Sequence, residues 1–199
     1  GEGRGEGLPR GSACLILDEA HATGLLGESG SGANEAAGHI ADICVSTASK
    51  ALGSLGGVIT GPTAAIDAVV NFARPFIFTT AVPPTQLAAI DAALDVIQDE
   101  PERRERVRAL AQRFRAALVD KGWPAESLGD DPTPIIPLIV GEADAAVALS
   151  HQLEAAGFYA PAIRPPSVPK GTSRVRVSVH ANLTDEQLDQ LIKAIPEGG

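Results

Sequence analysis

The sequence predicts an α/β fold: a larger domain built on a mostly parallel sheet, followed by a smaller α+β domain. Two observations support this prediction. Three short apolar runs, at residues 13–18, 42–49 and 56–61, resemble strands covered on both faces, and polar residues follow each of them. Beyond about residue 133 the order strand, helix, strand, strand, helix is typical of an α+β layer. The 199 residues, 44% of them hydrophobic, can form a packed core.

The elements between the two sheets follow from proline positions and apolar spacing. After Pro62 a helix is expected to about Phe72, and residues 74–80 (RPFIFTT) have the pattern of another strand. The proline pair at 83–84 can open a helix, because proline is tolerated in a first turn. That helix has apolar residues on one face: Leu87, Ile90, Leu94 and Ile97.

A second, charged helix should follow Pro101, which breaks the first one. Its apolar residues have the same helical spacing: Val107, Leu110, Phe114 and Leu118. After a loop come strands at 135–140, 158–163 and 173–180, with a helix at 143–156 after the first of them. The closing helix has its own apolar face: Leu188, Leu191, Ile192 and Ile195.

These elements predict three segments. Residues 1–12, rich in Gly, Pro and charge, should be a flexible segment unrelated to the fold. Residues 13–98 should form a larger α/β domain and residues 99–199 the small α+β domain, with the boundary between about residues 96 and 133.

Composition excludes some classes of function. A net charge of −9 argues against nucleic acid as a partner. Neither a signal peptide nor an apolar run long enough to span a membrane is visible, so a cytoplasmic protein is expected. Cys14 and Cys44 lie in strand-like runs, where buried reduced thiols are expected, and no metal site is predicted.

The strongest local signal is DEAHATG, residues 18–24, directly after the first apolar run. In α/β folds, ligands bind at the carboxyl edge of the sheet, where Asp18 and His21 should lie. Two other interpretations are a polar turn without chemistry and the acidic box of an NTPase. The NTPase interpretation requires an upstream phosphate loop, G-x-x-x-x-G-K-[ST], which this chain lacks.

Lys50 ends the second apolar run among small hydroxyl residues and glycines, STASKALG. A lysine in a partly desolvated site can form a Schiff base, although a single loop lysine is more often only a solvated charge. Asp18 and Lys50 end adjacent predicted strands, and the chain between them is long enough for one crossover. The pair therefore indicates a site better than either residue alone.

Four segments together resemble successive motifs of the α-oxoamine synthases, enzymes of the fold-type I class that depend on pyridoxal 5′-phosphate (PLP). They are LILDEAHATGLLGESGSG, STASKALGSLGGVITG, RPFIFTTAVPP and AIRPPSVPKGTSRVRVSV, in the family's order from Ala13 to Ile195. The resemblance implies that residues 13–98 are the C-terminal part of the large, PLP-binding domain of the PLP-dependent transferase fold. It also implies a decarboxylating condensation of an amino acid with an acyl thioester in a homodimer with shared active sites. The IRPPSVP segment is most similar to the biotin-synthesis branch, which implies L-alanine and a pimeloyl thioester; glycine and the 2-amino-3-ketobutyrate ligase remain an alternative.

The resemblance also implies residue roles. Asp18 would pair with the ring nitrogen, and His21 would hydrogen-bond the ring oxygen. Lys50 would carry PLP and remove the α-proton of the substrate. Thr47 would bind the phosphate of its own subunit. Thr79 and Thr80 would bind that of the neighbouring subunit, although two strand threonines without a role are equally ordinary.

Arg164 and Arg176 are the candidates for the substrate carboxylate, because a guanidinium group binds a carboxylate through two hydrogen bonds. Arg164 precedes a rigid Pro-Pro turn. Arg176 alternates with valines and could equally be a solvated sheet residue. No ranking of the two follows.

Members of the resembled family are much longer and carry other cofactor contacts in an N-terminal portion. The chain is therefore expected to be a fragment with an unpaired sheet edge, poorly folded or inactive alone. A non-enzymatic alternative is an inactive fragment that serves only as a folding or interaction module.

Overall fold

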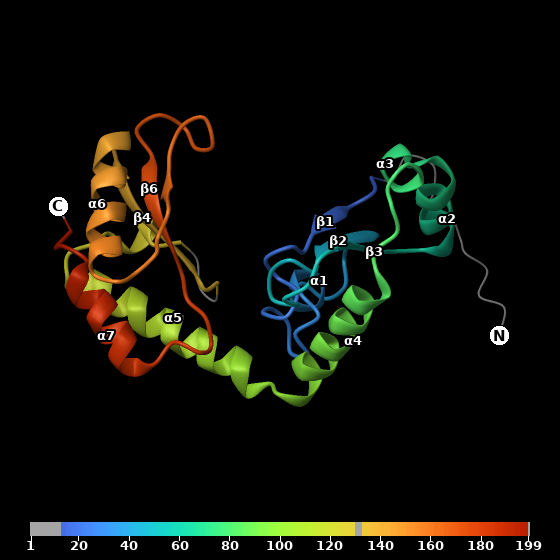
Figure 1. Cartoon of the computed structure of the whole chain (residues 1–199), viewed down its shortest axis with the longest axis horizontal. Coiled ribbons are helices and arrows are strands. Elements are labelled where there is room, and N and C mark those ends of the chain that lie inside the picture. The colour runs from blue at the N-terminus through green and yellow to red at the C-terminus, as the bar shows by residue number, and fades with distance from the viewer. Residues whose placement is uncertain (1–12, 130–132, 199) are drawn as a thin grey trace. The chain divides into compact units, whose positions relative to one another are not determined.

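The structure, a computed structural model, describes residues 13–129 and 133–198 (Figure 1). The segment predicted to be flexible, residues 1–12, lies outside the described residues. The chain divides into two compact units, Gly1–Pro101 and Glu102–Gly199, called here the N-terminal and C-terminal units.

The sheet of the N-terminal unit has three strands: β1 (Ile16–Asp18), β2 (Ile43–Thr47) and β3 (Gly57–Thr60), in that order. β1 and β2 are adjacent and parallel, as predicted. β3 is antiparallel to β2, so the prediction of a mostly parallel sheet is wrong for this strand. A parallel return needs a crossover of about a dozen residues or more, and the connection from Thr47 to Gly57 is too short for one.

Burial of this sheet is lower than its apolar sequence predicts. All four residues of β3 are exposed, and none of β1 or β2 is fully buried. Both cysteines are free, as expected, but the expectation that they are buried is wrong: Cys14 is exposed and Cys44 half-buried. An apolar sequence shows only that a strand could be buried. Whether it is buried depends on which other segments pack against the sheet.

Helices α1 (Ala33–Ala36), α2 (Thr63–Phe72), α3 (Arg74–Ile77) and α4 (Pro84–Asp99) complete the N-terminal unit. The strand predicted at 74–80 is wrong, because α3 occupies its first half. The amide groups of Phe76 and Ile77 both donate to the carbonyl of Ala73, and Pro75 lies in the first turn, where its missing N–H costs nothing.

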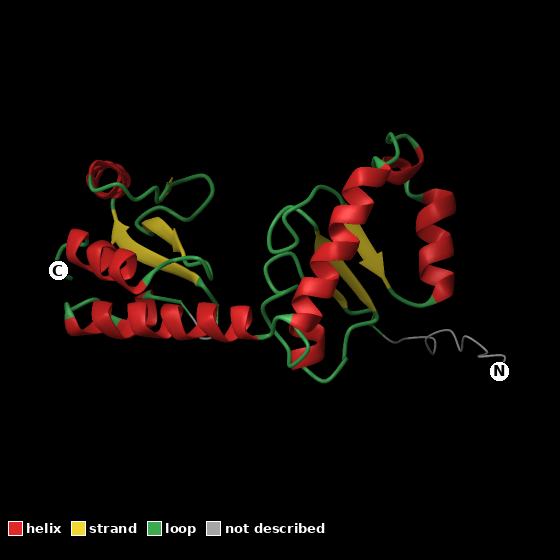
Figure 2. Ribbon diagram, turned by 60° about the horizontal axis from the view of Figure 1, so that its bottom comes forward, coloured by secondary structure: helices red, strands yellow, loops and turns green. Residues whose placement is uncertain are grey.

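Helix α4 passes across the sheet of this unit (Figure 2). Ile90 and Leu94, from its predicted apolar face, line a cavity of about 370 Å³ together with Cys44, Ser46, Val58 and Thr60 of the sheet. In the paired register, Cys44 lies opposite Thr60 and Ser46 opposite Val58, so the four strand residues share one face.

The C-terminal unit follows the predicted order of helices and strands. Its elements are α5 (Glu102–Asp120), the 3-10 turn η1 (Ala125–Ser127), β4 (Ile135–Gly141), α6 (Ala143–Ala155), β5 (Ala162–Ile163), β6 (Ser173–Ser178) and α7 (Asp185–Ala194). The sheet is antiparallel in the order β4-β6-β5, and α6 lies beside it (Figure 1). β5 is much shorter than the strand predicted at 158–163.

The core of this unit contains the apolar residues that the helical and strand periodicities predict. Val175 and Val177 of β6 are buried while Arg176 between them is exposed, the alternation expected of a strand with one covered face. The largest fully buried side chains come from the helices, β4 and the η1 end: Leu110, Phe114, Leu118, Leu128, Ile136, Leu138, Leu153, Leu188 and Ile195.

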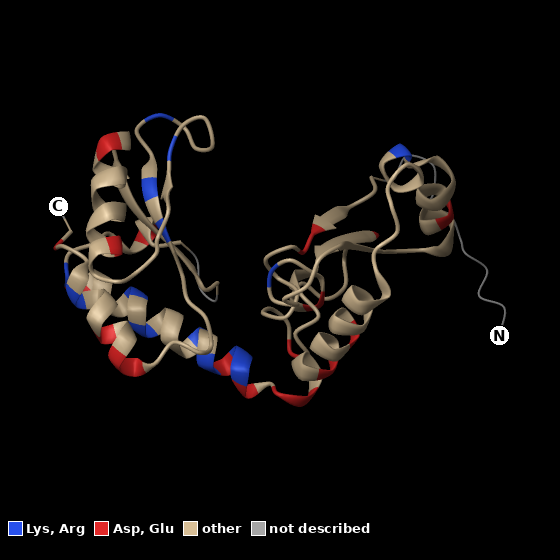
Figure 3. Ribbon diagram, viewed as in Figure 1, with Lys and Arg blue, Asp and Glu red and all other residues tan. Residues whose placement is uncertain are grey.

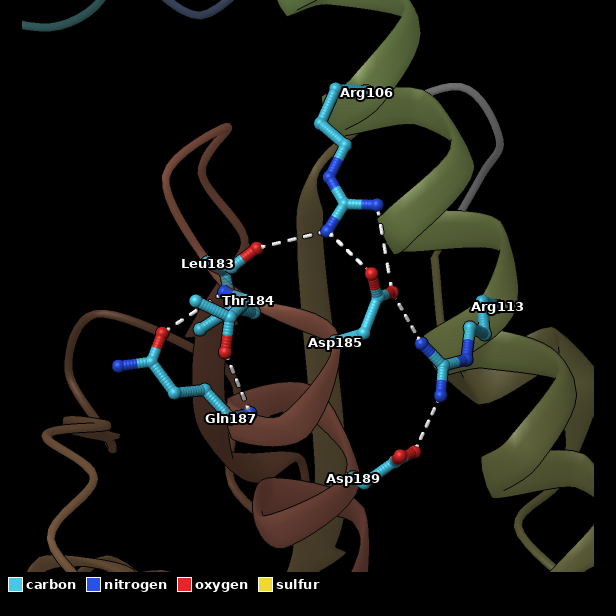
Figure 4. A network of polar contacts seen from close by, with 7 residues as sticks. All are labelled: Arg106, Arg113, Leu183, Thr184, Asp185, Gln187 and Asp189. Atoms are coloured by element: carbon cyan, nitrogen blue, oxygen red, sulfur yellow. Dashed lines mark hydrogen bonds and ion pairs between the residues drawn. The ribbon is translucent and has the colours of Figure 1, made fainter.

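Helices α5 and α7 are joined by charged side chains (Figure 4). Nη2 of Arg106 lies 3.0 Å from Oδ2 of Asp185, and Nη1 of Arg113 lies 2.6 Å from Oδ1 of the same carboxylate. Thr184 and Gln187 form a capping box at the start of α7, in which each side chain hydrogen-bonds the backbone N–H of the other residue.

Candidate functional site

Asp18 is the last residue of β1, and its side chain is exposed. The amide of Ala20 donates to its Oδ1 at 2.8 Å. Among the described residues, Oδ2 of Asp18 has no hydrogen-bond partner, so this oxygen is available to a ligand. Directly afterwards, the amide of Glu19 donates to the carbonyl of Val45 at 2.7 Å, which extends the pairing of β1 with β2 by one bond.

His21 lies in a tight turn that begins at Glu19. The amides of Ala22 and Thr23 both donate to the carbonyl of Glu19, at 2.8 and 2.9 Å. In this turn Ala22 is buried, whereas His21, three residues after Asp18, is exposed.

Lys50 lies in the loop that follows β2, three residues after the last strand residue, Thr47, whereas the apolar run predicted a strand that continues to Lys50. The loop is compact: the amide of Ala48 donates to Gly56 at 2.9 Å, and the amide of Ser54 to Ala48 at 2.7 Å. The Lys50 side chain is exposed. Its ammonium group makes no hydrogen bond or ion pair with any residue in the described part of the chain, and this leaves the amine available for chemistry.

Thr47, the last residue of β2, is half-buried. Its hydroxyl lies 2.9 Å from that of Ser49 and 3.4 Å from the carbonyl of Gly56. Since β1 and β2 run in parallel, with Asp18 opposite Val45, Thr47 and Asp18 lie at the same edge of the sheet. Four of the predicted site residues, Asp18, His21, Thr47 and Lys50, thus come from neighbouring segments at one sheet edge.

Thr79 and Thr80 lie elsewhere in the N-terminal unit, after α3, and are exposed. They end no strand, which corrects the prediction of a strand before them. Arg164 and Arg176 belong to the C-terminal unit, directly after β5 and within β6. Both guanidinium groups are exposed, and neither contacts a partner among the residues that the structure describes.

Lys50 lies in a part of the chain that has few basic residues. In the described part of the N-terminal unit the basic residues are Lys50 and Arg74, while acidic residues are numerous (Figure 3). The arginine-rich helix α5 and most other basic residues belong to the C-terminal unit.

Glu19 is a residue of the site region whose role the sequence did not reveal. Its side chain is only 3% exposed, and its carboxylate accepts hydrogen bonds from the amides of Ala33 at 2.6 Å and Asn34 at 2.7 Å. Gly32 has a φ of +129°, and a Cβ there would lie 2.3 Å from a Glu19 oxygen. The positive φ and this close approach require glycine, so Gly32 in the segment ESGSG was the available signal in the sequence.

Glu35 fixes the same glycine-rich loop from its outer side. Its carboxylate accepts the backbone N–H of Ser29 at 2.9 Å, the amide of Ser31 at 3.0 Å and the Ser29 hydroxyl. The hydrogen bond from the Ser29 amide is the largest cause of a lowered pKa of Glu35. The loop is therefore held by two carboxylates, one buried and one at the surface.

The donor set of the sheet edge fits PLP. An available carboxylate oxygen suits a protonated pyridine nitrogen, an imidazole suits a ring hydroxyl, and a free primary amine is what a cofactor aldehyde requires. Asp18, His21 and Lys50 provide these groups, and Thr47 adds a hydroxyl for a phosphate. No cluster of three or more metal-ligating side chains occurs in residues 13–129 and 133–198. In the same residues no helix has the length and apolar character of a membrane span.

Comparison with known proteins identifies the family of this chain. A profile of the family described as aminotransferase class I and II matches residues 8–195. 8-Amino-7-oxononanoate synthase of Alkalilimnicola ehrlichii is 45% identical over 186 residues, which are 92% of this chain and 47% of that protein. The chain thus spans about half the length of the curated relatives it matches.

Solved structures show the same relationship. A structure of serine palmitoyltransferase with PLP as an internal aldimine is 29% identical, with a TM-score of 0.84 over 91% of this chain and 46% of that one. The 8-amino-7-oxononanoate synthase of Francisella tularensis is also 29% identical, with a TM-score of 0.78 over 90% of this chain and 53% of its own. The predicted fold-type I fold is confirmed. This chain belongs to the aminotransferase class I and II family, whose cofactor here is PLP, and its relatives within that family are α-oxoamine synthases.

Proposed function

We propose that this chain carries the lysine-bearing part of an α-oxoamine synthase active site. The whole enzyme would join an amino acid to an acyl thioester, releasing CO₂ and the free thiol. The observation that supports this best is the arrangement of Lys50 and Asp18: an amine without a partner among the described residues and a carboxylate with one available oxygen follow adjacent parallel strands.

Each residue of the sheet edge would have one task. When bound, PLP withdraws electrons from the α-carbon of an amino acid and so makes its proton removable. Oδ2 of Asp18 would hold a proton on the ring nitrogen, and the His21 imidazole would hydrogen-bond the ring oxygen. Nζ of Lys50 would bind the cofactor and then accept the α-proton of the substrate. The Thr47 hydroxyl would donate to the phosphate.

The proposed substrates are L-alanine and a pimeloyl thioester, giving 8-amino-7-oxononanoate for biotin synthesis. The names of the relatives support this choice. Glycine as the amino donor is the alternative. Arg164 and Arg176 are proposed for the substrate carboxylate, because their guanidinium groups are exposed and have no partner in the described part of the chain.

The proposed assembly is a homodimer with shared active sites. Three phenylalanines in the segment 72–78, which precedes Thr79 and Thr80, are exposed. The exposed fraction is 80% for Phe72, 55% for Phe76 and 77% for Phe78. Exposed aromatic side chains clustered in a short segment are typical of a protein interface. A second copy covering this segment would bring Thr79 and Thr80 to its own phosphate site.

The test is covalent trapping of PLP. The 199-residue protein is incubated with PLP, reduced with borohydride, digested and analysed by mass spectrometry, alongside Lys50→Ala and Arg74→Ala. Arg74→Ala is the matched control, because Arg74 is the other basic residue in the described part of the N-terminal unit. We expect the reduced cofactor on the peptide containing Lys50 in the wild type and in Arg74→Ala, and none in Lys50→Ala.

Labelling that persists in Lys50→Ala would contradict the assignment of Lys50. A folded wild type that takes up no PLP at this peptide would instead favour the inactive module.

A further inference from the structure

We propose that Thr23 and Ser46 are positioning residues: their hydroxyl pair fixes the turn that carries His21 against the segment that carries Lys50. The inference rests on the proposed function, because it assigns these two residues a role at the same site. Within the described residues the two hydroxyl groups hydrogen-bond each other and the carbonyl of Glu19, and neither bonds Asp18, His21, Thr47 or Lys50. Both would therefore act through the backbone segments that they join.

The main evidence for this role is a short hydrogen bond between the hydroxyl groups of Thr23 and Ser46. Oγ1 of Thr23 lies 2.6 Å from Oγ of Ser46, and the pair is partly buried. Oγ1 of Thr23 also donates to the carbonyl of Glu19 at 3.2 Å. A hydroxyl has one hydrogen to donate, so Ser46 must be the donor to Thr23. The result is a chain of two hydrogen bonds with a defined direction, from Ser46 of β2 through Thr23 to the carbonyl of Glu19, where the turn that carries His21 begins.

This pair lies where the backbone pairing of β1 and β2 ends. The last backbone hydrogen bond between the two segments joins Glu19 to Val45, the residue before Ser46. Beyond it, the chain carrying His21 and the chain carrying Lys50 separate into a turn and a loop. At this point the hydrogen bond between the side chains of Thr23 and Ser46 takes the place of backbone hydrogen bonds between the two segments.

A second contact ties the same two segments one residue further along. Gly24 has a φ of +80°, and a Cβ added there would lie 2.9 Å from the Cβ of Ala51, the neighbour of Lys50. The same Cβ would lie 3.2 Å from a methyl group of Ile97 in α4. The absence of a side chain at Gly24 therefore allows the turn to pack closely on the Lys50 loop.

The far end of the loop is also anchored. The Ser54 hydroxyl donates to the carbonyl of Gln86 in α4 at 3.1 Å. The Lys50 loop is thus held at Ser46, Ala51 and Ser54, while the Lys50 side chain itself stays exposed. Reacting groups must be held within a fraction of an ångström, so anchoring the backbone on both sides of Lys50 helps to hold its amine in place for chemistry.

The test compares Thr23→Val, Ser46→Ala, the double variant and Thr60→Val as the matched control. Thr60 lies on the same sheet face as Ser46, and its hydroxyl has no hydrogen-bond partner within the described residues. Amide hydrogen exchange is measured in the protein without PLP, at Ala48, Gly53 and Ser54. We expect exchange about 3- to 10-fold faster in each single variant, the size of one lost hydrogen bond, with little further increase in the double variant. Thr60→Val should match the wild type.

The second readout is the rate at which PLP becomes fixed to Lys50 under borohydride. It should fall by a similar factor in Thr23→Val and recover in Thr23→Ser, which keeps the hydroxyl. Exchange and fixation rates that match those of Thr60→Val would overturn the inference. If the wild type itself fixes no PLP at Lys50, the proposed function fails, while the exchange measurement still decides whether the hydroxyl pair holds the loop.

Discussion

Glu19 shows how one buried carboxylate can organise the polypeptide around a site. Charged groups are rarely buried unless hydrogen-bonded, and Glu19 meets this requirement with two backbone amides at the start of α1. It lies between Asp18 and the turn of His21, so it joins the sheet edge to the glycine-rich loop. Glu19 thus has a structural role, while its neighbours have the proposed chemical ones.

Replacing Glu19 by alanine is expected to loosen the loop from Gly24 to Asn34. Two buried amides would lose a charged acceptor, and hydrogen bonds to charged groups contribute about 1.5–3 kcal/mol. Limited proteolysis within this loop should therefore become faster. Asp91→Ala, an exposed acidic residue of α4, is the control. Equal cleavage of both variants would show that Glu19 does not hold the loop.

Among individual residues, the positions of Asp18 and Lys50 could be predicted because each follows an apolar run, which is a local feature of the sequence. The contact of Thr23 with Ser46 could not, because it depends on the register of β1 with β2 and on a side chain far along the chain.

At the scale of elements, helices α5 and α7 illustrate pairing that charge pattern alone does not reveal. Asp185 lies in the first turn of α7, where the helix dipole favours a negative charge, and it receives Arg106 and Arg113 from α5. The hydrogen bond from Arg106 is the largest cause of the lowered pKa of Asp185.

The pH dependence of this contact has a definite sign. A carboxylate with a lowered pKa in the folded state stabilises the protein above its ordinary pKa of about 3.9, and this stability is lost as the pH falls through the folded value. Asp185→Asn should therefore lower the urea midpoint of unfolding at pH 7, and the difference from the wild type should shrink in acid. Glu186→Gln, in the same turn, serves as control. A difference that stays constant from pH 7 to below pH 3 would disagree with this account.

The segment 74–80 shows that residue composition alone can predict the wrong type of secondary structure. Its β-branched and aromatic residues predicted a strand, but a strand needs a partner for its backbone groups, and the local hydrogen bonds to Ala73 form a helical turn instead.

At the scale of the whole molecule, the two units differ in how much apolar surface they bury. Among the described residues, the cluster of buried apolar side chains that forms the hydrophobic core belongs to the C-terminal unit, around Phe114, Leu138 and Leu153. In the described part of the N-terminal unit the buried apolar residues are Ala22, Ala48 and Leu52, while many larger ones are exposed. Stability should therefore be concentrated in the C-terminal unit.

Two phenylalanine substitutions test this distribution. Phe114 is fully buried, so Phe114→Ala should lower the free energy of unfolding of the C-terminal unit by about 3–5 kcal/mol. Phe72 is 80% exposed, and Phe72→Ala should leave the free energy of unfolding of the C-terminal unit unchanged. Trp123, the single tryptophan and 6% exposed, reports on the C-terminal unit by fluorescence. Similar midpoints for both variants would refute a core centred on Phe114.

Periodicity was enough to predict the helices of the C-terminal unit, and strand-end chemistry indicated a site at Asp18 and Lys50. The resemblance of four sequence segments to a known family predicted the family and the residues expected to hold PLP. These are local properties, because a helix face or a strand end is written within a few consecutive residues. The antiparallel direction of β3, the exposure of the N-terminal sheet, the burial of Glu19 and the hydroxyl pair beside Lys50 became visible only in three dimensions. Each depends on which distant segments meet, and no short stretch of sequence specifies that.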